Sequence, residues 1–232
     1  MNKFAGKNIV ILTGAGISAE SGLRTFRDAD GLWEGHRVEE VATPEAFQEN
    51  PKLVHEFYNM RRAQLKTVEP NAAHLALAEF EKNHTGGFIL ITQNVDDLHE
   101  RAGSKNIIHM HGELTKVRCL DTGEVFPWKG DTGLKTPHPK SGHADGRLRP
   151  HICWFGEMPY SMFEISTAVG KADIFIAIGT SGVVYPAAGL VSETKHTCRR
   201  VLINKEGVSN NFFFKEMILG AASETVPEFF LG

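Results

Sequence analysis

The chain has 232 residues, 41% of them hydrophobic, and a formal net charge of −3, so it can bury a core in one large domain or in one large and one small. This charge gives no electrostatic footprint for nucleic acid, and no nucleic-acid partner is expected. Three scattered cysteines favour a reducing compartment over a disulfide framework, and we expect a cytoplasmic protein. The uncharged run 174–192 contains glycines and Pro186, so it predicts strand, loop and helix rather than a membrane span.

The first element is an apolar β-branched run at 9–12, which predicts a buried strand followed at once by a glycine turn at 14–16. Residues 17–21 can then begin a helix. Gly14, Gly16 and Ala19 have the spacing of a dinucleotide fingerprint, in which glycines admit a pyrophosphate and a helix N-terminus supplies donors. A tight strand-to-helix turn without a ligand needs the same glycines.

The segment that follows departs from an ordinary dehydrogenase. A second strand ending in an acid, which would hold the ribose, does not occur about 20 residues on. The polar segment 25–33, with Phe26 and Trp33, instead predicts a loop that covers a nucleotide. This pattern favours a nucleotide bound for something other than hydride transfer.

Helix signals come next. Thr43 is a predicted cap with Pro44 in the first turn, and Pro51 begins a longer helix. On that helix Tyr58 and Arg61 are three residues apart and share a face. The same spacing is typical of a tyrosine packed on the core beside an arginine at the solvent edge. A structural role and a functional role for this pair therefore both stay open.

Two further strands, at 88–91 and from 107, end in polar residues. The first runs into Gln93, Asn94 and Asp96, of which one can simply cap a helix predicted at 95–101. The second ends at His111, before a glycine. Histidine suits general-base work near neutral pH, although a lone histidine is more often structural.

Segment 115–150 changes character, because it is rich in glycine, proline and charge and shows little apolar periodicity. We expect an irregular lobe outside the main sheet. Cys119, His138 and His143 are its only soft ligands, and the sequence contains no CxxC pair, so a structural zinc site is not predicted.

The last two predicted strands, at 172–178 and 199–203, complete an alternation of strands and helices. The alternation predicts an α/β fold with a doubly wound parallel sheet. Four strand ends would then converge on one crevice: those at 14–16, 93–94, 179–181 and Asn204.

These motifs occur together, and in this order, in one known family. GAGISAESGLRTFR, TQNVDD, HG, FGE, GTS and the asparagine after the last core strand resemble the sirtuins, which are NAD-dependent protein lysine deacylases. The resemblance covers essentially the whole chain. RTFRDADGLWE, FYNMRR and GTSGVVYPAAG are most similar to the bacterial CobB-type branch, class III.

The resemblance implies a Rossmann-like large domain at 1–24, 68–114 and 151–232, and a second, smaller domain made of two insertions. These are a helical module at 25–67 and a degenerate zinc-ribbon lobe at 115–150, which retains one cysteine where the family normally carries four. Structural zinc is therefore not expected, and we predict that the lobe is held by packing and hydrogen bonds.

The resemblance also assigns site residues. It implies catalytic roles for His111 as general base and for Asn94 and Asp96 on nicotinamide and ribose. The NAD-binding residues that it implies are Gly14, Ala15, Gly16, Ser18, Glu20, Phe26, Arg27, Trp33, Gln93, Asn94, Asp96, Gly179, Thr180, Ser181, Asn204, Glu206 and Ala222. The substrate-binding residues are Ala42, Tyr58, Arg61, Phe155, Gly156, Glu157, Gly182 and Val183.

The implied reaction consumes NAD as a co-substrate. The acyl group of a lysine is transferred to ADP-ribose, and nicotinamide, O-acyl-ADP-ribose and free lysine are released. The Tyr-x-x-Arg pair implies acceptance of succinyl and malonyl as well as acetyl groups, with acylated lysine peptides or proteins as partners of a monomer. Mono-ADP-ribosyl transfer, which shares the NAD-cleaving step, and an idle NAD-binding module are the alternatives.

Overall fold

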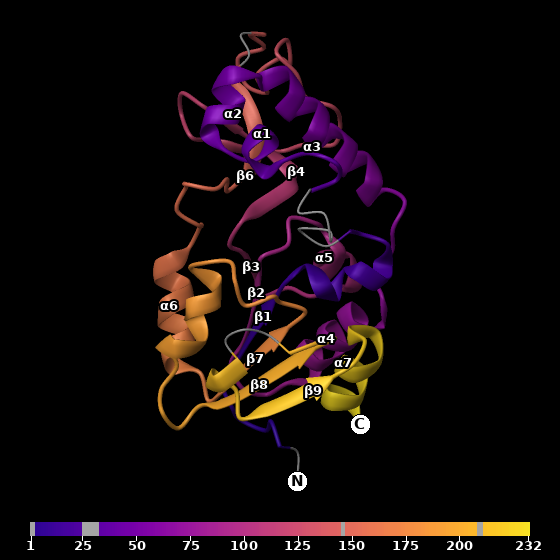
Figure 1. Ribbon diagram of the computed structural model, residues 1–232, viewed down its shortest axis with the longest axis vertical. Coiled ribbons are helices and arrows are strands. Elements are labelled where there is room, and N and C mark those ends of the chain that lie inside the picture. The colour runs from indigo at the N-terminus through magenta and orange to yellow at the C-terminus, as the bar shows by residue number, and fades with distance from the viewer. Residues whose placement is uncertain (1–2, 25–32, 145–146, 208–210) are drawn as a thin grey trace.

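The computed structural model describes residues 3–24, 33–144, 147–207 and 211–232 (Figure 1). Its larger part is built on a six-stranded parallel sheet in the order β3-β2-β1-β7-β8-β9. The strands are β1 (Ile9–Thr13), β2 (Phe88–Thr92), β3 (Ile107–His109), β7 (Ile174–Ile178), β8 (Arg199–Asn204) and β9 (Glu216–Leu219). The order reverses at β1 and β7, which is where open α/β sheets place their ligands.

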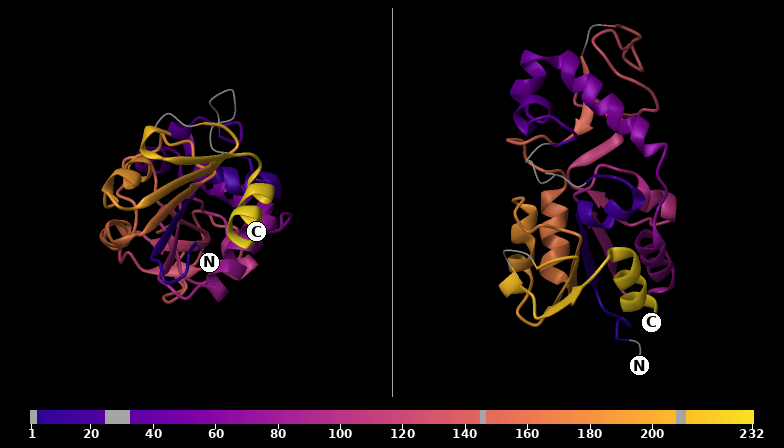
Figure 2. Two further views of the ribbon diagram at one scale, coloured as in Figure 1. Left: turned by 90° about the horizontal axis from the view of Figure 1, so that it is seen from below. Right: turned by 45° about the vertical axis from the view of Figure 1, so that its right-hand side comes forward.

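Helices cover both faces of this sheet. Alternate residues of β1 point to opposite faces, so Ile9 and Ile11 join one core cluster while Val10 and Leu12 join another. The helices α4 (Ala72–Asn83) and α7 (Ala222–Leu231) cover the first face. The helix α6 (Met162–Lys171) and the 3₁₀ helix η3 (Ala187–Glu193) cover the second, as the right-hand view of Figure 2 shows. The predicted doubly wound, Rossmann-like sheet is confirmed.

A smaller domain stands at the carboxyl end of the strands (Figure 1). It combines the helices α1 (Val38–Val41), α2 (Pro44–Glu49) and α3 (Pro51–Leu65) with an antiparallel sheet in the order β5-β4-β6. These strands are β4 (Gly112–Cys119), β5 (Val125–Pro127) and β6 (Leu148–Ile152). One core cluster contains Phe57 and Tyr58 of α3 together with Leu114 of β4 and Ile152 of β6, so the two insertions fold against each other. The residue boundaries given above for the two domains stay a prediction.

Several local predictions are confirmed and several are wrong. Thr43 caps α2, because its hydroxyl accepts from the Ala46 N–H at 3.0 Å. The helix predicted from residue 17 is absent from the described chain: two 3₁₀ turns, η1 (Ala15–Ile17) and η2 (Ala19–Ser21), end at Gly22 with φ of 98°. Such short turns provide no helix dipole for a phosphate. The helix predicted at 95–101 begins only at residue 98, as α5 (Leu98–Ala102).

The lobe at 115–150 lies outside the main sheet, as predicted, but its two ends are strands of the small sheet rather than irregular chain. A small core of Val117, Cys119 and Leu148 packs against Phe126 and Trp128. Both oxygens of Asp121 accept hydrogen bonds from Arg147. These contacts agree with a lobe held by packing and hydrogen bonds. No helix in the part of the chain that the structure describes is both long enough and apolar enough to cross a membrane.

Candidate active site

A cavity lies where the two domains meet, above the carboxyl ends of β1, β2 and β7. Residues from both domains line it: Gly14, Ala15, Leu23, Arg24, Trp33, Ala42, Tyr58, Arg61, Gln93, Asn94, Val95, Asp96, His111, Ile152, Cys153, Trp154, Phe155, Gly156, Glu157, Pro159, Gly179, Thr180, Ser181, Val184 and Tyr185. The predicted convergence of strand ends on one crevice is therefore found for β1, β2 and β7.

The glycine turn after β1 is pressed against the end of β7. Gly14 and Gly16 donate backbone hydrogen bonds to the carbonyls of Ile178 and Gly179 at 3.0 and 2.8 Å. A Cβ at Gly16 would come within 2.7 Å of the Gly179 Cα, and Gly179 itself has φ of 61°. The close approach of two backbones thus requires glycine here, while Gly14 and Ala15 also face the cavity.

Ser18 joins the two polar residues that follow β2. Its hydroxyl donates to Asp96 Oδ2 at 3.0 Å and accepts from Asn94 Nδ2 at 3.1 Å. Asn94 Nδ2 also donates to the Gly14 carbonyl at 3.1 Å, and Asp96 Oδ1 accepts from the Leu98 N–H. Burial raises the pKa of Asp96, and these two bonds to its carboxylate oppose that rise. Asn94 and Asp96 are therefore fixed at the cavity wall, with Ser18 behind them.

A buried histidine, His74 of α4, contacts the Ser18 hydroxyl. The N–H of Asn71 donates to His74 Nδ1 at 3.3 Å, so Nε2 carries the ring proton and faces Ser18 Oγ at 3.4 Å. Burial lowers the pKa of His74 to about 4, and the ring is neutral near pH 7. Sequence reasoning gave no role to His74, because nothing in the pattern of its helix distinguishes it from a core residue.

His111 is held in one tautomer. Its Nδ1 lies 3.1 Å from the Gln93 carbonyl oxygen, which can only accept, so Nδ1 carries the proton and Nε2 keeps its lone pair. Burial lowers the pKa of His111, and the bond to Gln93 offsets this in part. A neutral imidazole at a cavity wall, whose Nε2 has no hydrogen-bond partner among the described residues, is the arrangement that a general base needs.

Hydroxyl and amide groups link the ends of β2, β7 and β8. Gln93 Nε2 donates to Thr180 Oγ1 at 3.2 Å, which ties the ends of β2 and β7 together. Asn204, at the end of β8, donates to the Thr180 and Glu206 carbonyls at 3.3 and 2.8 Å. Asn204 thus shapes the loop that carries Thr180 and Ser181.

The small domain closes the cavity with Tyr58 and Arg61 of α3. The Tyr58 hydroxyl is fully buried and accepts from Trp154 Nε1 at 3.0 Å, and burial raises its pKa. Arg61 Nη1 donates to Glu34 Oε1 at 2.7 Å and to Gln64 Oε1 at 3.0 Å. Arg61 Nε is buried and has no acceptor among the described residues. Arg61 itself is among the residues that line the cavity.

Segment 155–157 is anchored by an internal ion pair. Arg149 donates to both carboxylate oxygens of Glu157, at 2.6 and 2.8 Å, and its guanidinium stacks over Trp154. Although burial raises the pKa of Glu157, the bonds from Arg149 and from the Trp154 N–H lower it below its ordinary value. The Phe155 N–H donates to the Ala42 carbonyl at 3.0 Å, which links this segment to the helical module.

Comparison with known proteins shows the family of this chain. The family model described as the Sir2 family matches residues 14–186, well over half of the chain. The chain belongs to the Sir2 family. The predicted sirtuin resemblance is thereby confirmed.

Two similar relatives of this Sir2 family chain are proteins named NAD-dependent protein deacylase. One from Rhodopirellula baltica is 56% identical over 230 residues, covering 95% of this chain and 96% of that protein. One from Escherichia coli is 57% identical over 226 residues, covering 95% and 80%. A solved complex of a Sir2 homologue with NAD has a TM-score of 0.85 at 41% identity, covering 95% of this chain and 86% of that one.

The predicted site residues of this Sir2 family chain fall into three groups. Those that line the cavity are Gly14, Ala15, Trp33, Ala42, Tyr58, Arg61, Gln93, Asn94, Asp96, His111, Phe155, Gly156, Glu157, Gly179, Thr180 and Ser181. Those described but outside its lining are Gly16, Ser18, Glu20, Asn204, Glu206, Ala222, Gly182 and Val183. Phe26 and Arg27 lie outside the described residues.

Glu20, which lies outside the cavity lining, has partners on α7. Both carboxylate oxygens of Glu20 accept from Ser223, through its N–H at 2.9 Å and its hydroxyl at 3.0 Å. This contact holds the first turn of α7 against η2. The cavity residues that sequence reasoning missed are mostly apolar or come from loops, such as Trp154, Cys153 and Tyr185.

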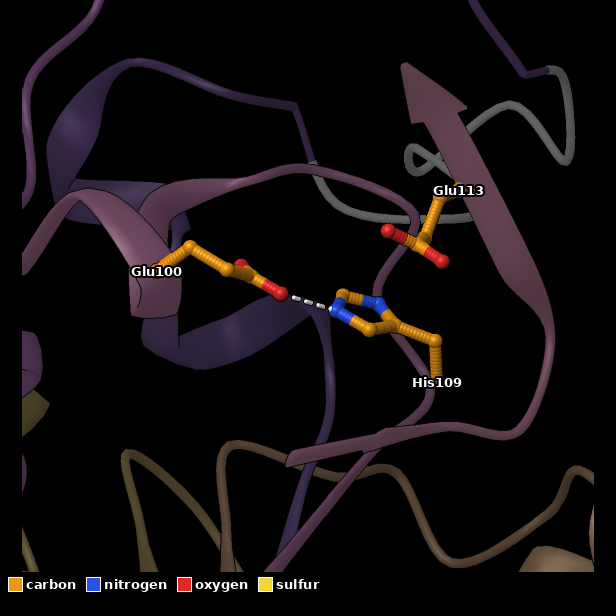
Figure 3. A group of neighbouring side chains, drawn as sticks. All are labelled: Glu100, His109 and Glu113. Carbon is orange, nitrogen blue, oxygen red and sulfur yellow. Dashed lines mark hydrogen bonds and ion pairs between the residues drawn. The ribbon is translucent and has the colours of Figure 1, made fainter. Parts of the chain in front are cut away.

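Within the described ranges, one group of side chains has the spacing of a metal site. Glu100 of α5, His109 of β3 and Glu113 of β4 place their ligand atoms within 4.8 Å of one another (Figure 3). Each carboxylate already has a cationic or hydrogen-bonding partner, because Glu100 binds His109 and Glu113 binds Lys116. Burial lowers the pKa of His109, but the hydrogen bond and charge of Glu100 raise it above its ordinary value overall. Cys119, His138 and His143 do not form such a group in the described chain.

Proposed function

We propose that this protein is an NAD-dependent protein lysine deacylase that removes acetyl and acidic acyl groups, succinyl and malonyl, from lysine side chains. The products would be nicotinamide, O-acyl-ADP-ribose and the free lysine. Support comes from the Sir2 family membership and from relatives that are named deacylases.

The observation that carries the proposal is the state of His111. A module that only bound NAD would need no base, yet this chain holds a half-buried neutral imidazole whose proton is kept on Nδ1 by Gln93. The remaining nitrogen can take a proton from a ribose hydroxyl and so assist attack of that hydroxyl oxygen on the acyl carbon. The same cavity wall carries Asn94 and Asp96.

The groups around the cavity fit NAD. The open side of the glycine turn can approach a pyrophosphate, and Asn94 and Asp96 offer an amide and a carboxylate for nicotinamide and ribose. Thr180 and Ser181 offer hydroxyls on the adenosine side. Bound NAD would supply an electrophilic ribose carbon; the protein orients it and holds the proton acceptor. With no α-helix at the glycine turn, backbone amides rather than a helix dipole would meet the phosphates.

Acyl-group selection is assigned to Ala42, Tyr58 and Arg61. A small residue at Ala42 leaves room, and all three line the cavity. The Tyr58 oxygen accepts from Trp154, so its own proton remains to be donated to an oxygen of the acyl group. Arg61 can add charge-assisted hydrogen bonds to a carboxylate.

The substrate main chain is proposed to lie between segments 155–157 and 182–184, as an added strand whose pairing tolerates many sequences. Side chains at this rim are exposed although apolar: Phe155 at 41%, Val183 at 52% and Tyr185 at 73%. Partners would be acylated lysine peptides and proteins, acted on by a cytoplasmic monomer.

The test is product analysis with one peptide carrying acetyl-, succinyl- or malonyl-lysine. Mass spectrometry should show NAD-dependent loss of each acyl mass with one nicotinamide released per lysine. Gain of an ADP-ribose mass on an acceptor, without loss of the acyl group, would favour ADP-ribosyl transfer and contradict the proposal. Nicotinamide release that does not depend on an acylated peptide would contradict it as well.

A further inference from the structure

Glu34 neutralises the arginine that faces the acyl end of the cavity. Its Oε1 lies 2.7 Å from Arg61 Nη1, and both side chains are nearly buried, at 13% and 8% exposure. Arg61 lines the cavity, whereas Glu34 is not among its lining residues and reaches Arg61 through Nη1. A carboxylate entering the cavity would therefore meet a guanidinium that is already paired.

The backbone holds Glu34 in this place at a conformational cost. Glu34 and Gly35 have φ of 50° and 81°, and the Trp33 and His36 backbones exchange hydrogen bonds of 2.9 and 3.0 Å across them. Two consecutive positive φ values between paired residues form a type I′ turn, which favours Asn, Asp or Gly at its first central position. What Glu supplies there, and Asn or Gly would not, is a carboxylate that reaches Arg61.

Resting on the proposed function, we infer that Glu34 sets the acyl-group preference by acting through Arg61. By balancing the charge of Arg61, Glu34 weakens binding of succinyl- and malonyl-lysine and keeps acetyl-lysine a competitive substrate. Glu34 is a specificity-determining residue that does not itself touch the acyl group. Its charge, and not only its hydrogen bond, carries the effect.

Two substitutions separate the charge from the contact. Glu34→Gln keeps the length and the acceptor oxygen but removes the charge, and we expect KM for the succinyl peptide to fall about tenfold, the scale of one relieved like-charge contact. Values of kcat, and both constants for the acetyl peptide, should stay within about twofold. Glu34→Asp keeps the charge and suits the left-handed backbone, so its succinyl-to-acetyl ratio should stay near that of the unchanged protein.

Glu56→Gln is the matched control, because it removes one charge from the same helical module, where Glu56 pairs with Lys52 on an exposed face. It should leave both KM values unchanged. In the Arg61→Met background, Glu34→Gln should have no further effect on the ratio. Thermal unfolding of each variant checks that it is folded at the assay temperature.

The outcomes distinguish this inference from the proposed function. If the unchanged protein removes acetyl and succinyl groups but Glu34→Gln leaves the KM ratio unaltered, or shifts both substrates in parallel, the role of Glu34 is overturned and the deacylase proposal stands. A rise in KM for the succinyl peptide would also overturn it, because Glu34 would then orient Arg61. If neither peptide is deacylated by the unchanged protein, the proposed function itself fails.

Discussion

Replacing Arg61 by Met tests the proposal that this residue binds acidic acyl groups. Met fills similar space but cannot bind a carboxylate, and a hydrogen bond to a charged group contributes about 1.5–3 kcal/mol. This range corresponds to a rise of about 10- to 150-fold in KM for a succinyl-lysine peptide. The acetyl group carries no charge for Arg61 to meet, so KM for the acetyl peptide should change by less than about twofold.

The same substitution affects folding, and a control removes this ambiguity. Loss of Arg61 leaves Glu34, at 13% exposure, without its cation, and breaking a buried ion pair costs roughly 3–5 kcal/mol, here towards the lower end. Arg62→Met removes an equally buried guanidinium from the same helix. Arg62 does not line the cavity, and its Nε donates to the Leu114 carbonyl at 2.9 Å. It should lower stability without changing the ratio of the two KM values.

The assay is steady-state deacylation of matched acetyl and succinyl peptides at saturating NAD, with thermal unfolding of both variants. The reasoning is refuted if Arg61→Met raises both KM values together, because Arg61 would then be a structural residue of the helix face. It is also refuted if Arg62→Met discriminates between the peptides as strongly as Arg61→Met does.

Three further results are expected. Ser18→Ala removes the hydroxyl that joins Asn94 to Asp96. We expect kcat/KM to fall by about tenfold or more, the scale of a lost hydrogen bond to a charged group, and calorimetry to show weaker NAD binding. Unchanged NAD binding would show that Asn94 and Asp96 are held in place without Ser18. His55 and His74 have folded pKa values of about 4 against an ordinary 6.5, so the unfolded state binds more protons below pH 6.5. The unfolding free energy should therefore decrease as the pH falls from about 6.5 to 4, by up to about 1.4 kcal/mol per pH unit for each histidine. Equal urea midpoints at pH 7 and pH 5 would contradict this expectation. Chelator treatment should leave the thermal midpoint unaltered and elemental analysis should find no stoichiometric zinc, whereas one zinc per chain would overturn the prediction that the lobe needs none.

The parallel sheet could be predicted because its strands are continuous apolar runs, buried on both faces, between helices with clear signals. β9 escaped prediction, because Met217 and Leu219 are half exposed at the sheet edge and the strand has only four residues. The wrong helix after β1 shows a different limit. Its pattern suits a helix, but Gly22 in the left-handed region ends the second 3₁₀ turn, and tertiary contact with β7 fixes the first.

In the candidate site, the residues at strand ends could be predicted from the sequence, but the side chains that hold them in place could not. Asn94, Asp96 and His111 follow apolar strands, so topology alone brings them to one edge. The contacts of His74 with Ser18 and of Glu34 with Arg61 join residues 56 and 27 positions apart, and no local pattern specifies them. Long-range polar pairing of this kind depends on packed tertiary geometry, which periodicity does not encode.

The most direct test of the central account is to measure two reactions of a His111→Ala variant. In the proposed reaction His111 is the general base, so deacylation should fall by about two or more orders of magnitude, the usual scale for a positioned acid–base group. In the proposed reaction nicotinamide leaves before the base acts, so exchange of labelled free nicotinamide into NAD, in the presence of acyl peptide, should persist. Near-normal deacylation by the variant, or equal loss of both reactions in a folded protein, would contradict the role assigned to His111.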